Sequence, residues 1–349
     1  MQIREITDAI VARRCYGVDI SSCYRDIFEY CFLPETKLMD CKENKSIVCA
    51  FWSAIAANDE DALLEVLAPD LQVYNPLGSE PQNRDIHIQT LLQWNRAFSA
   101  SRFEIEEQIC EGNMVVTRGV MQAIHSKGTF LGVPPTGTKI AVPGITIARI
   151  RDGRIVERHV CSDRLGMMRR LGILPSPQAG GPGTAAGRVG QADAPISQES
   201  RKSDYFEQKE HSAMMSEQYK AVSRRYFSAC QFNDHSALKE VLSSELLAHH
   251  PGLPGPLSRD ELLQTIDAFA KAFSEQEYTI EDQVAEGDTV ATRVTWRATH
   301  SGPFQGVPAT GRRTAVGGIA ISHIENGRIV ERWLSMDQME MLKQLRLVP

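Results

Sequence analysis

The sequence FLGVPPTGTKIAVPGITIARIRDGRIVERHVCSD, residues 130–163, decides the fold of this chain because it occurs twice. Its second copy, FQGVPATGRRTAVGGIAISHIENGRIVERWLSMD, covers residues 304–337. When Gly132 is aligned on Gly306, 18 of 32 positions are identical, although the two segments lie 174 residues apart. Such identity does not arise by chance, so the chain contains an internal duplication.

Each copy predicts the same local structure. A Val-Pro-Pro-Thr-Gly or Val-Pro-Ala-Thr-Gly segment comes first, in which proline fixes φ and glycine permits positive φ, as turns require. Two β-rich runs follow, at residues 140–150 and 154–162 in the first copy. Asp152-Gly153 separates them there and Asn326-Gly327 in the second copy, and both dipeptides are strong hairpin signals.

The order of elements within each repeat indicates an α+β fold. Helical patterns at 42–57, 59–67 and 84–99 precede strand patterns at 103–110 and 114–124 in the first repeat. Between the two repeats, a stretch rich in glycine and alanine has no hydrophobic periodicity, which indicates a flexible linker. These patterns predict an N-terminal appendage at 1–41, a first domain at 42–175, the linker at 176–203 and a second domain at 204–349.

Composition excludes several classes of protein. A net charge of -6 argues against a nucleic-acid partner, and no apolar run approaches the length of a membrane span. Arg4, Arg13 and Arg14 interrupt the N-terminus where a secretory signal would be apolar, so a cytoplasmic protein is expected. The 8 cysteines do not have the spacing of zinc ligands, which predicts free thiols and no metal site.

The repeated segment resembles the SnoaL-like polyketide cyclase family, within the nuclear transport factor 2-like superfamily. The matching pattern is histidine, then Phe-x-Gly-Val-Pro-Pro-Thr-Gly, Gly-Ile-x-Ile, Asp-Gly-Arg-Ile-Val-Glu and a final aspartate before a short helix. This resemblance implies two cone-shaped domains, each with helices packed on a curved antiparallel sheet around a pocket. It also implies an intramolecular pseudo-dimer packed through the sheets, and it allows for a further homo-oligomer.

The resemblance also shows which residues of this chain stand at the positions of the family's catalytic pair. The cyclases use an aspartate on the last strand and a histidine on the strand before it; these positions hold Val160 and Thr146 in repeat one, and Leu334 and Ala320 in repeat two. Valine and leucine cannot transfer a proton, so that mechanism does not carry over as it stands. The limonene epoxide hydrolases share the fold. However, the positions of their catalytic aspartates do not hold Asp or Glu in either repeat of this chain.

Four residues remain as catalytic candidates. His125 and His300 precede the Pro-Thr-Gly loops and could transfer a proton, or could instead tether the loop by hydrogen bonds. Arg118 and Arg293 lie in mid-strand and could hold an oxyanion, or could instead face outward and pair with an acid. Asp163 and Asp337 stand before helical runs, where N-capping is the preferred interpretation.

Further residues are candidates for binding a substrate, because they are polar or aromatic and differ between the repeats. They are Tyr74, Asn75, Trp94 and His159 in repeat one, and His249, His250 and Trp333 in repeat two. The resemblance, together with these residues, thus implies a cofactor-free cyclase or isomerase that acts on a small, mostly apolar molecule of polyketide or terpenoid type. The alternative is a binding or interaction module without catalysis, and repeat one is favoured as the active copy.

Overall fold

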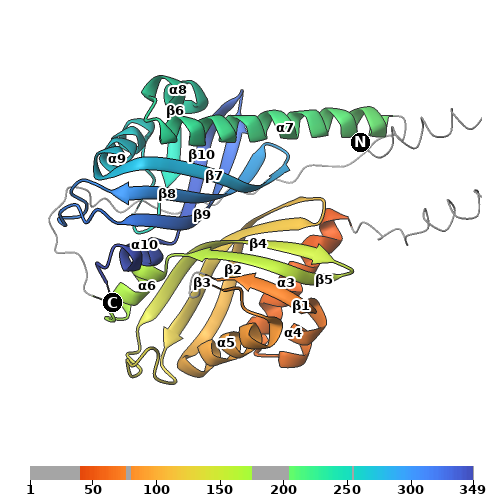
Figure 1. Ribbon diagram of the computed structural model, residues 1–349. Helices are drawn as coiled ribbons and strands as arrows, with labels where there is room; N and C mark the ends of the chain where they lie inside the picture. The colour runs from red at the N-terminus through yellow and green to blue at the C-terminus, as the bar shows by residue number, and fades with distance from the viewer. Residues whose placement is uncertain (1–39, 76–79, 175–203, 254, 349) are drawn as a thin grey trace, which may run out of the picture. The chain divides into compact units, whose positions relative to one another are not determined.

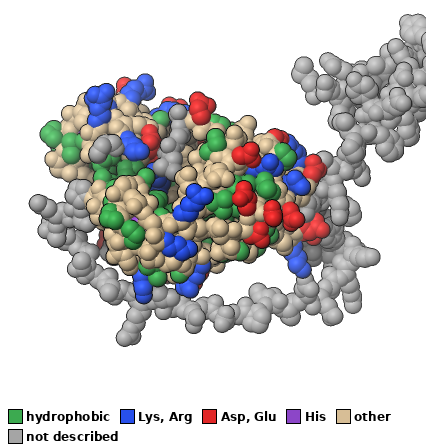
Figure 2. All heavy atoms as spheres, turned by 90° about the horizontal axis from the view of Figure 1, so that it is seen from below, with side chains coloured by type: hydrophobic (Ala, Val, Ile, Leu, Met, Phe, Trp, Pro, Cys, Tyr) green, Lys and Arg blue, Asp and Glu red, His purple; other side chains and the backbone are tan. Residues whose placement is uncertain are grey.

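The computed structural model describes residues 40–75, 80–174, 204–253 and 255–348 (Figure 1). The expected appendage at 1–41, apart from its last two residues, and most of the expected linker lie outside the described residues. Within the described part of the chain, no helix combines the length and the apolar character needed to cross a membrane. On the face in Figure 2, basic, acidic and apolar side chains are interspersed, and no extended basic surface is seen there.

The described part of repeat one contains four helices and five strands. In chain order they are α3 (Cys41–Ala57), α4 (Glu60–Val66), β1 (Leu67–Tyr74), α5 (Arg84–Ala97), β2 (Phe98–Glu111), β3 (Met114–His125), β4 (Lys139–Arg151), β5 (Arg154–Ser162) and α6 (Arg164–Arg170). Asp40 caps α3 in a capping box with Glu43. Three helices cover one face of the sheet, where Phe51, Leu63 and Ile88 join the buried strand residues (Figure 1).

Repeat two follows the same plan. Its elements are α7 (Asp204–Gln231), α8 (His235–Val241), β6 (Leu242–His249), α9 (Arg259–Ala272), β7 (Phe273–Glu286), β8 (Thr289–His300), β9 (Arg313–Glu325), β10 (Arg328–Met336) and α10 (Gln338–Gln344). The strand orders are β1-β5-β4-β3-β2 and β6-β10-β9-β8-β7. The α+β prediction is therefore confirmed in both repeats.

The sheets differ from the expectation in one respect, because each has one parallel pair. β1 runs parallel to β5, and β6 runs parallel to β10, while the other neighbours are antiparallel. Each of these first strands precedes the whole meander and joins it at the far edge. β2 also begins earlier than the predicted 103–110, since it follows α5 at Phe98 with no intervening loop, and β1 likewise follows α4 directly at Leu67.

Asp163 and Asp337 are helix caps, as the sequence indicated. The carboxylate of Asp163 accepts a hydrogen bond from the Gly166 amide at 2.8 Å, and that of Asp337 accepts one from the Glu340 amide at 3.1 Å. These bonds satisfy amide donors that a helix start leaves free.

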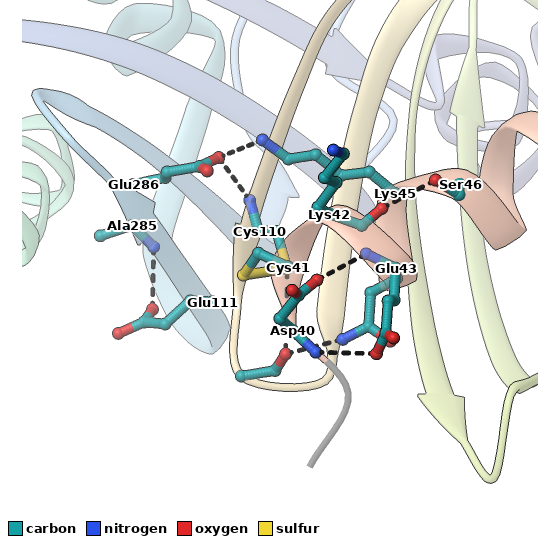
Figure 3. The surroundings of a disulfide bond; sticks show 12 residues. Asp40, Cys41, Lys42, Glu43, Lys45, Ser46, Cys110, Glu111, Ala285 and Glu286 are labelled. Atoms are coloured by element: carbon teal, nitrogen blue, oxygen red, sulfur yellow. Dashed lines mark hydrogen bonds and ion pairs between the residues drawn. A yellow bond between two sulfur atoms is a disulfide. The ribbon is translucent and has the colours of Figure 1, made fainter. Parts of the chain in front are cut away.

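Equivalent carboxylates of the two repeats make reciprocal contacts with the other repeat. Glu111 accepts hydrogen bonds from the Ala285 amide at 2.8 Å and from Lys220 Nζ at 2.7 Å. Its counterpart Glu286 accepts them from the Cys110 amide at 2.9 Å and from Lys45 Nζ at 2.6 Å (Figure 3). Nearby, apolar strand residues of both repeats form one buried cluster: Ile109, Val116, Ile145, Ile147, Cys161, Val284, Ala291, Ile319 and Ile321.

The prediction of free thiols is wrong for two cysteines. Cys41 and Cys110 form a disulfide with a Cα–Cα distance of 5.5 Å, which joins the start of α3 to the end of β2 (Figure 3). Their separation of 69 residues gave no sequence signal for pairing. Cys49, Cys161 and Cys230 are free, and burial raises the pKa of the Cys161 thiol to about 12.

Candidate functional site

A mostly apolar cavity of repeat one lies between its helices and the concave face of its sheet. Its volume is about 660 Å³, within the range of small-molecule sites. Aromatic side chains from α3, α5, β2 and the loop after β3 form much of the wall: Trp52, Trp94, Phe103 and Phe130. Trp52 and Phe103 stack with their ring centroids 3.7 Å apart. The cavity therefore suits a flat, mostly apolar molecule.

Arg158, on β5, supplies a buried positive charge in this cavity. Its side chain is only 3% exposed, and its guanidinium lies 4.1 Å from the centroid of the Phe51 ring. Nη1 donates a hydrogen bond to His87 Nε2 at 3.0 Å. Burial lowers the pKa of Arg158 to about 9, so the guanidinium is charged at neutral pH but poorly solvated. This position was not among the sequence-based candidates.

His87, on α5, is neutral at physiological pH. Burial, and then the charge on Arg158, lower its pKa to about 3. Since Nε2 accepts the hydrogen bond from Arg158, the proton of the neutral ring is on Nδ1, which has no hydrogen-bond partner. A histidine with such a low pKa orients the guanidinium and is a poor general base at pH 7.

The remaining polar groups of the cavity add positive charge and donors. Arg164, at the start of α6, is buried, and neither of its terminal nitrogens has a hydrogen-bond partner. The indole Nε1 of Trp52 is also buried without a partner. None of the described residues that line the cavity is Asp or Glu. Three arginines, the exposed Arg96 and the buried Arg158 and Arg164, without a carboxylate in the described lining favour an anionic ligand or an oxygen that becomes negative during reaction.

The positions that correspond to the family's catalytic pair face this cavity. Val160 on β5 and Thr146 on β4 are cross-strand partners, and both line the wall. Strand alternation then directs Arg158, two residues before Val160, toward the same side. This alternation was the sequence signal that could have identified Arg158 in place of His159.

The predicted histidines have a structural role in their loops. His125 is fully buried, its Nε2 bonds the Gly128 carbonyl at 3.0 Å, and its Nδ1 contacts Thr136 Oγ1 at 3.3 Å. His300 is likewise buried and contacts Thr310 Oγ1 at 3.0 Å. Neither lines the cavity of its repeat, so the structure matches the loop-tether alternative.

The predicted arginines do not converge with those histidines. Arg118 pairs with Glu106 and Glu107 and lies 4.1 Å from the centroid of the Trp333 ring of the other repeat. Arg293 pairs with Asp282 at 2.6 Å. Both therefore correspond to the alternative of an arginine with an acidic partner. Neither lines the apolar cavity of its repeat, although Arg293 lines a separate cavity beside Tyr74 and His159.

The predicted binding residues divide between cavity and outer face. Asn75 and Trp94 line the cavity of repeat one, and His250 lines that of repeat two. Tyr74 and His159 stack on each other at 4.5 Å beside a separate polar cavity. His249 and Trp333 form the equivalent stack at 5.0 Å, and neither lines a cavity described above.

Comparison with known families fits this geometry. The SnoaL-like polyketide cyclase family matches residues 46–171 and 220–345. The chain belongs to this family. The SnoaL-like match thus covers both repeats, from α3 to α6 and from α7 to α10. No curated protein matches the chain.

Solved structures of similar sequence cover one repeat each. IdmH of Streptomyces antibioticus is 34% identical, and the match spans 37% of this chain and 99% of IdmH with a TM-score of 0.35. TsrD of Streptomyces laurentii is 28% identical over 38% of this chain and 96% of its own, also with a TM-score of 0.35. AclR of Streptomyces galilaeus is 25% identical over 38% and 99%, with a TM-score of 0.36.

Proposed function

We propose that repeat one is a cofactor-free cyclase or isomerase for a small, mostly apolar, polyketide-like molecule that reacts through an enolate. The observation that carries this proposal is the buried Arg158–His87 pair in an aromatic cavity whose described lining has no carboxylate. Membership in the SnoaL-like family supports the reaction class.

The chemistry follows from the charge of Arg158. A β-dicarbonyl compound that binds beside the guanidinium is stabilised as its enolate, and its proton passes to solvent. The enolate carbon then forms a bond to a carbonyl carbon of the same molecule, and the resulting alkoxide takes a proton from water. His87 fixes the orientation of the guanidinium, and the stacked Trp52 and Phe103 hold the chain of the substrate.

Binding without turnover is the second candidate function, and a specific observation favours it. Among the described residues of the lining, none titrates near neutral pH as a base, because burial and Arg158 lower the pKa of His87 to about 3. In that case Arg158 would hold a carboxylate or enolate as a ligand.

We further propose that the two repeats act as an intramolecular pseudo-dimer. The reciprocal bonds of Glu111 and Glu286 support this arrangement, because equivalent residues make equivalent contacts in both directions. Trp333 on Arg118 adds an aromatic contact between the repeats.

Benzoylacetone is a direct probe of the enolate proposal, since its enolate absorbs at longer wavelength than the neutral compound. Wild-type protein at pH 7 should show the enolate band and should exchange the α-protons of the probe for deuterium, which NMR detects. Arg158→Met should lower both signals at least tenfold, whereas the matched Arg332→Met in repeat two should retain them. Equal binding of the neutral compound by wild type and Arg158→Met, without exchange, would exclude the enolate route.

A further inference from the structure

Repeat two has a cavity of its own at the equivalent place, and it is smaller. Its volume is about 310 Å³, near the lower end for ligand cavities. Larger side chains occupy three wall positions: Trp296 stands where repeat one has Met121, and Leu334 and Met336 stand where it has Val160 and Ser162. The cavity therefore selects a smaller apolar body than the cavity of repeat one.

Arg332 is the counterpart of Arg158, and its guanidinium has fewer hydrogen-bond acceptors around it. The side chain is 2% exposed and lies in the cavity wall, with the guanidinium 4.5 Å from the centroid of the Tyr226 ring. Nε and Nη1 are both buried without a hydrogen-bond partner. Leu262 occupies the position of His87, so the histidine acceptor seen in repeat one is missing here.

Two more nitrogens of the same cavity lack partners. They are Nε2 of His250 and Nε of Arg169, which reaches this cavity from α6 of repeat one. Burial lowers the pKa of His250 to about 3, with a further contribution from Arg332, so the ring is neutral and can present an N–H. None of the described residues in the lining is Asp or Glu.

Buried donors without partners carry a large desolvation cost, and a buried guanidinium without a carboxylate costs more. A planar carboxylate matches a fork of Arg332 and would satisfy one of the two unpartnered nitrogens, Nε or Nη1, together with Nη2. Phe269, Tyr278 and Trp296 offer apolar surface beyond that fork. We propose that the cavity of repeat two is a second binding site, which takes a small aromatic or alicyclic carboxylate by its carboxyl group.

This proposal does not depend on the function of repeat one. A suitable probe is 4-fluorobenzoate, followed by 19F NMR on the full chain, with neutral 4-fluorobenzamide as the matched compound. The titration uses Arg158→Met protein, in which the first cavity has lost its guanidinium. We expect saturable binding of the benzoate at one site, and at least tenfold weaker binding of the benzamide.

Adding Arg332→Met in that background should weaken benzoate binding at least thirtyfold. Arg169 is half-buried, so Arg169→Gln should weaken benzoate binding a few-fold and leave the melting temperature unchanged. This second variant keeps the test valid if Arg332→Met fails to fold. Equal affinity for benzoate and benzamide, equal affinity with and without Arg332, or no saturable binding at millimolar probe would each overturn the proposal.

Discussion

Replacing Arg158 with methionine separates the stability of the protein from its binding function. Burial lowers the pKa of this guanidinium from 12.5 to about 9. One pKa unit corresponds to about 1.4 kcal/mol, so burying the charged guanidinium lowers the free energy of unfolding at neutral pH by roughly 5 kcal/mol. Because the folded-state pKa is the lower one, this cost is complete below about pH 9 and disappears as the pH rises toward 12.5.

Two interactions of Arg158 offset much of that cost. The hydrogen bond from Nη1 to His87 contributes about 1.5–3 kcal/mol, and the cation–π contact with Phe51 contributes about 2 kcal/mol. Methionine fills a similar volume and carries no charge. We therefore expect the free energy of unfolding of Arg158→Met to stay within about 1 kcal/mol of wild type or to rise, while affinity for an anionic ligand falls about 100-fold.

Calorimetric melting of the intact chain and ligand titration test these two effects together. Arg158→Lys is the matched control, because it keeps a positive charge and loses the planar group that stacks on Phe51. It should therefore be less stable than Arg158→Met. A loss of 3 kcal/mol or more in Arg158→Met would refute this reasoning and would make Arg158 a structural cation.

Two other predictions concern contacts that the sequence did not reveal. The hydrogen bond with Glu107 raises the pKa of His323, so this pair stabilises the fold below the ordinary histidine range and weakens as the pH rises through the raised value. His323→Gln should flatten the pH dependence of the melting temperature between pH 6 and 8. His323→Arg should flatten the same dependence and retain the stability of the fold. An unchanged pH dependence in both variants would contradict the role of the His323–Glu107 pair. Reductant should lower the melting temperature of wild type, because opening the Cys41–Cys110 loop removes up to about 4 kcal/mol from the free energy of unfolding. The melting temperature of Cys41→Ser should not change with reductant. Equal melting temperatures of wild type with and without reductant would rule out a stabilising Cys41–Cys110 bond.

Local signals in the sequence were enough to predict the hairpins and the helix caps. Asp152-Gly153 and Asn326-Gly327 mark hairpins whose strands pair as expected, and Asp163 caps the helix that follows the last strand. Such features depend on residues close together in the chain, so turn and cap preferences determine them. The parallel pairing of β1 with β5 depends on distant residues, and no local preference encodes it.

The site was harder to predict, because the face that a strand residue occupies depends on register shifts that the sequence does not show. Arg118 lies on a strand whose neighbour β2 has register shifts, so alternation along β2 and β3 could not be followed. On β5 no shift separates Arg158 from Val160, and alternation there was reliable. His87 carried no signal, since a single histidine on an amphipathic helix does not show which strand residue it will meet.

The duplication places two cavities on one polypeptide, and this changes what mutation can do. In an assembly of identical subunits every substitution appears in both pockets, so the pockets must remain alike. Here the residues at equivalent positions differ, with Met121 in one cavity and Trp296 in the other, and His87 in one and Leu262 in the other. One pocket can therefore acquire a new specificity while its neighbour keeps the old one, and both are always made in equal amounts.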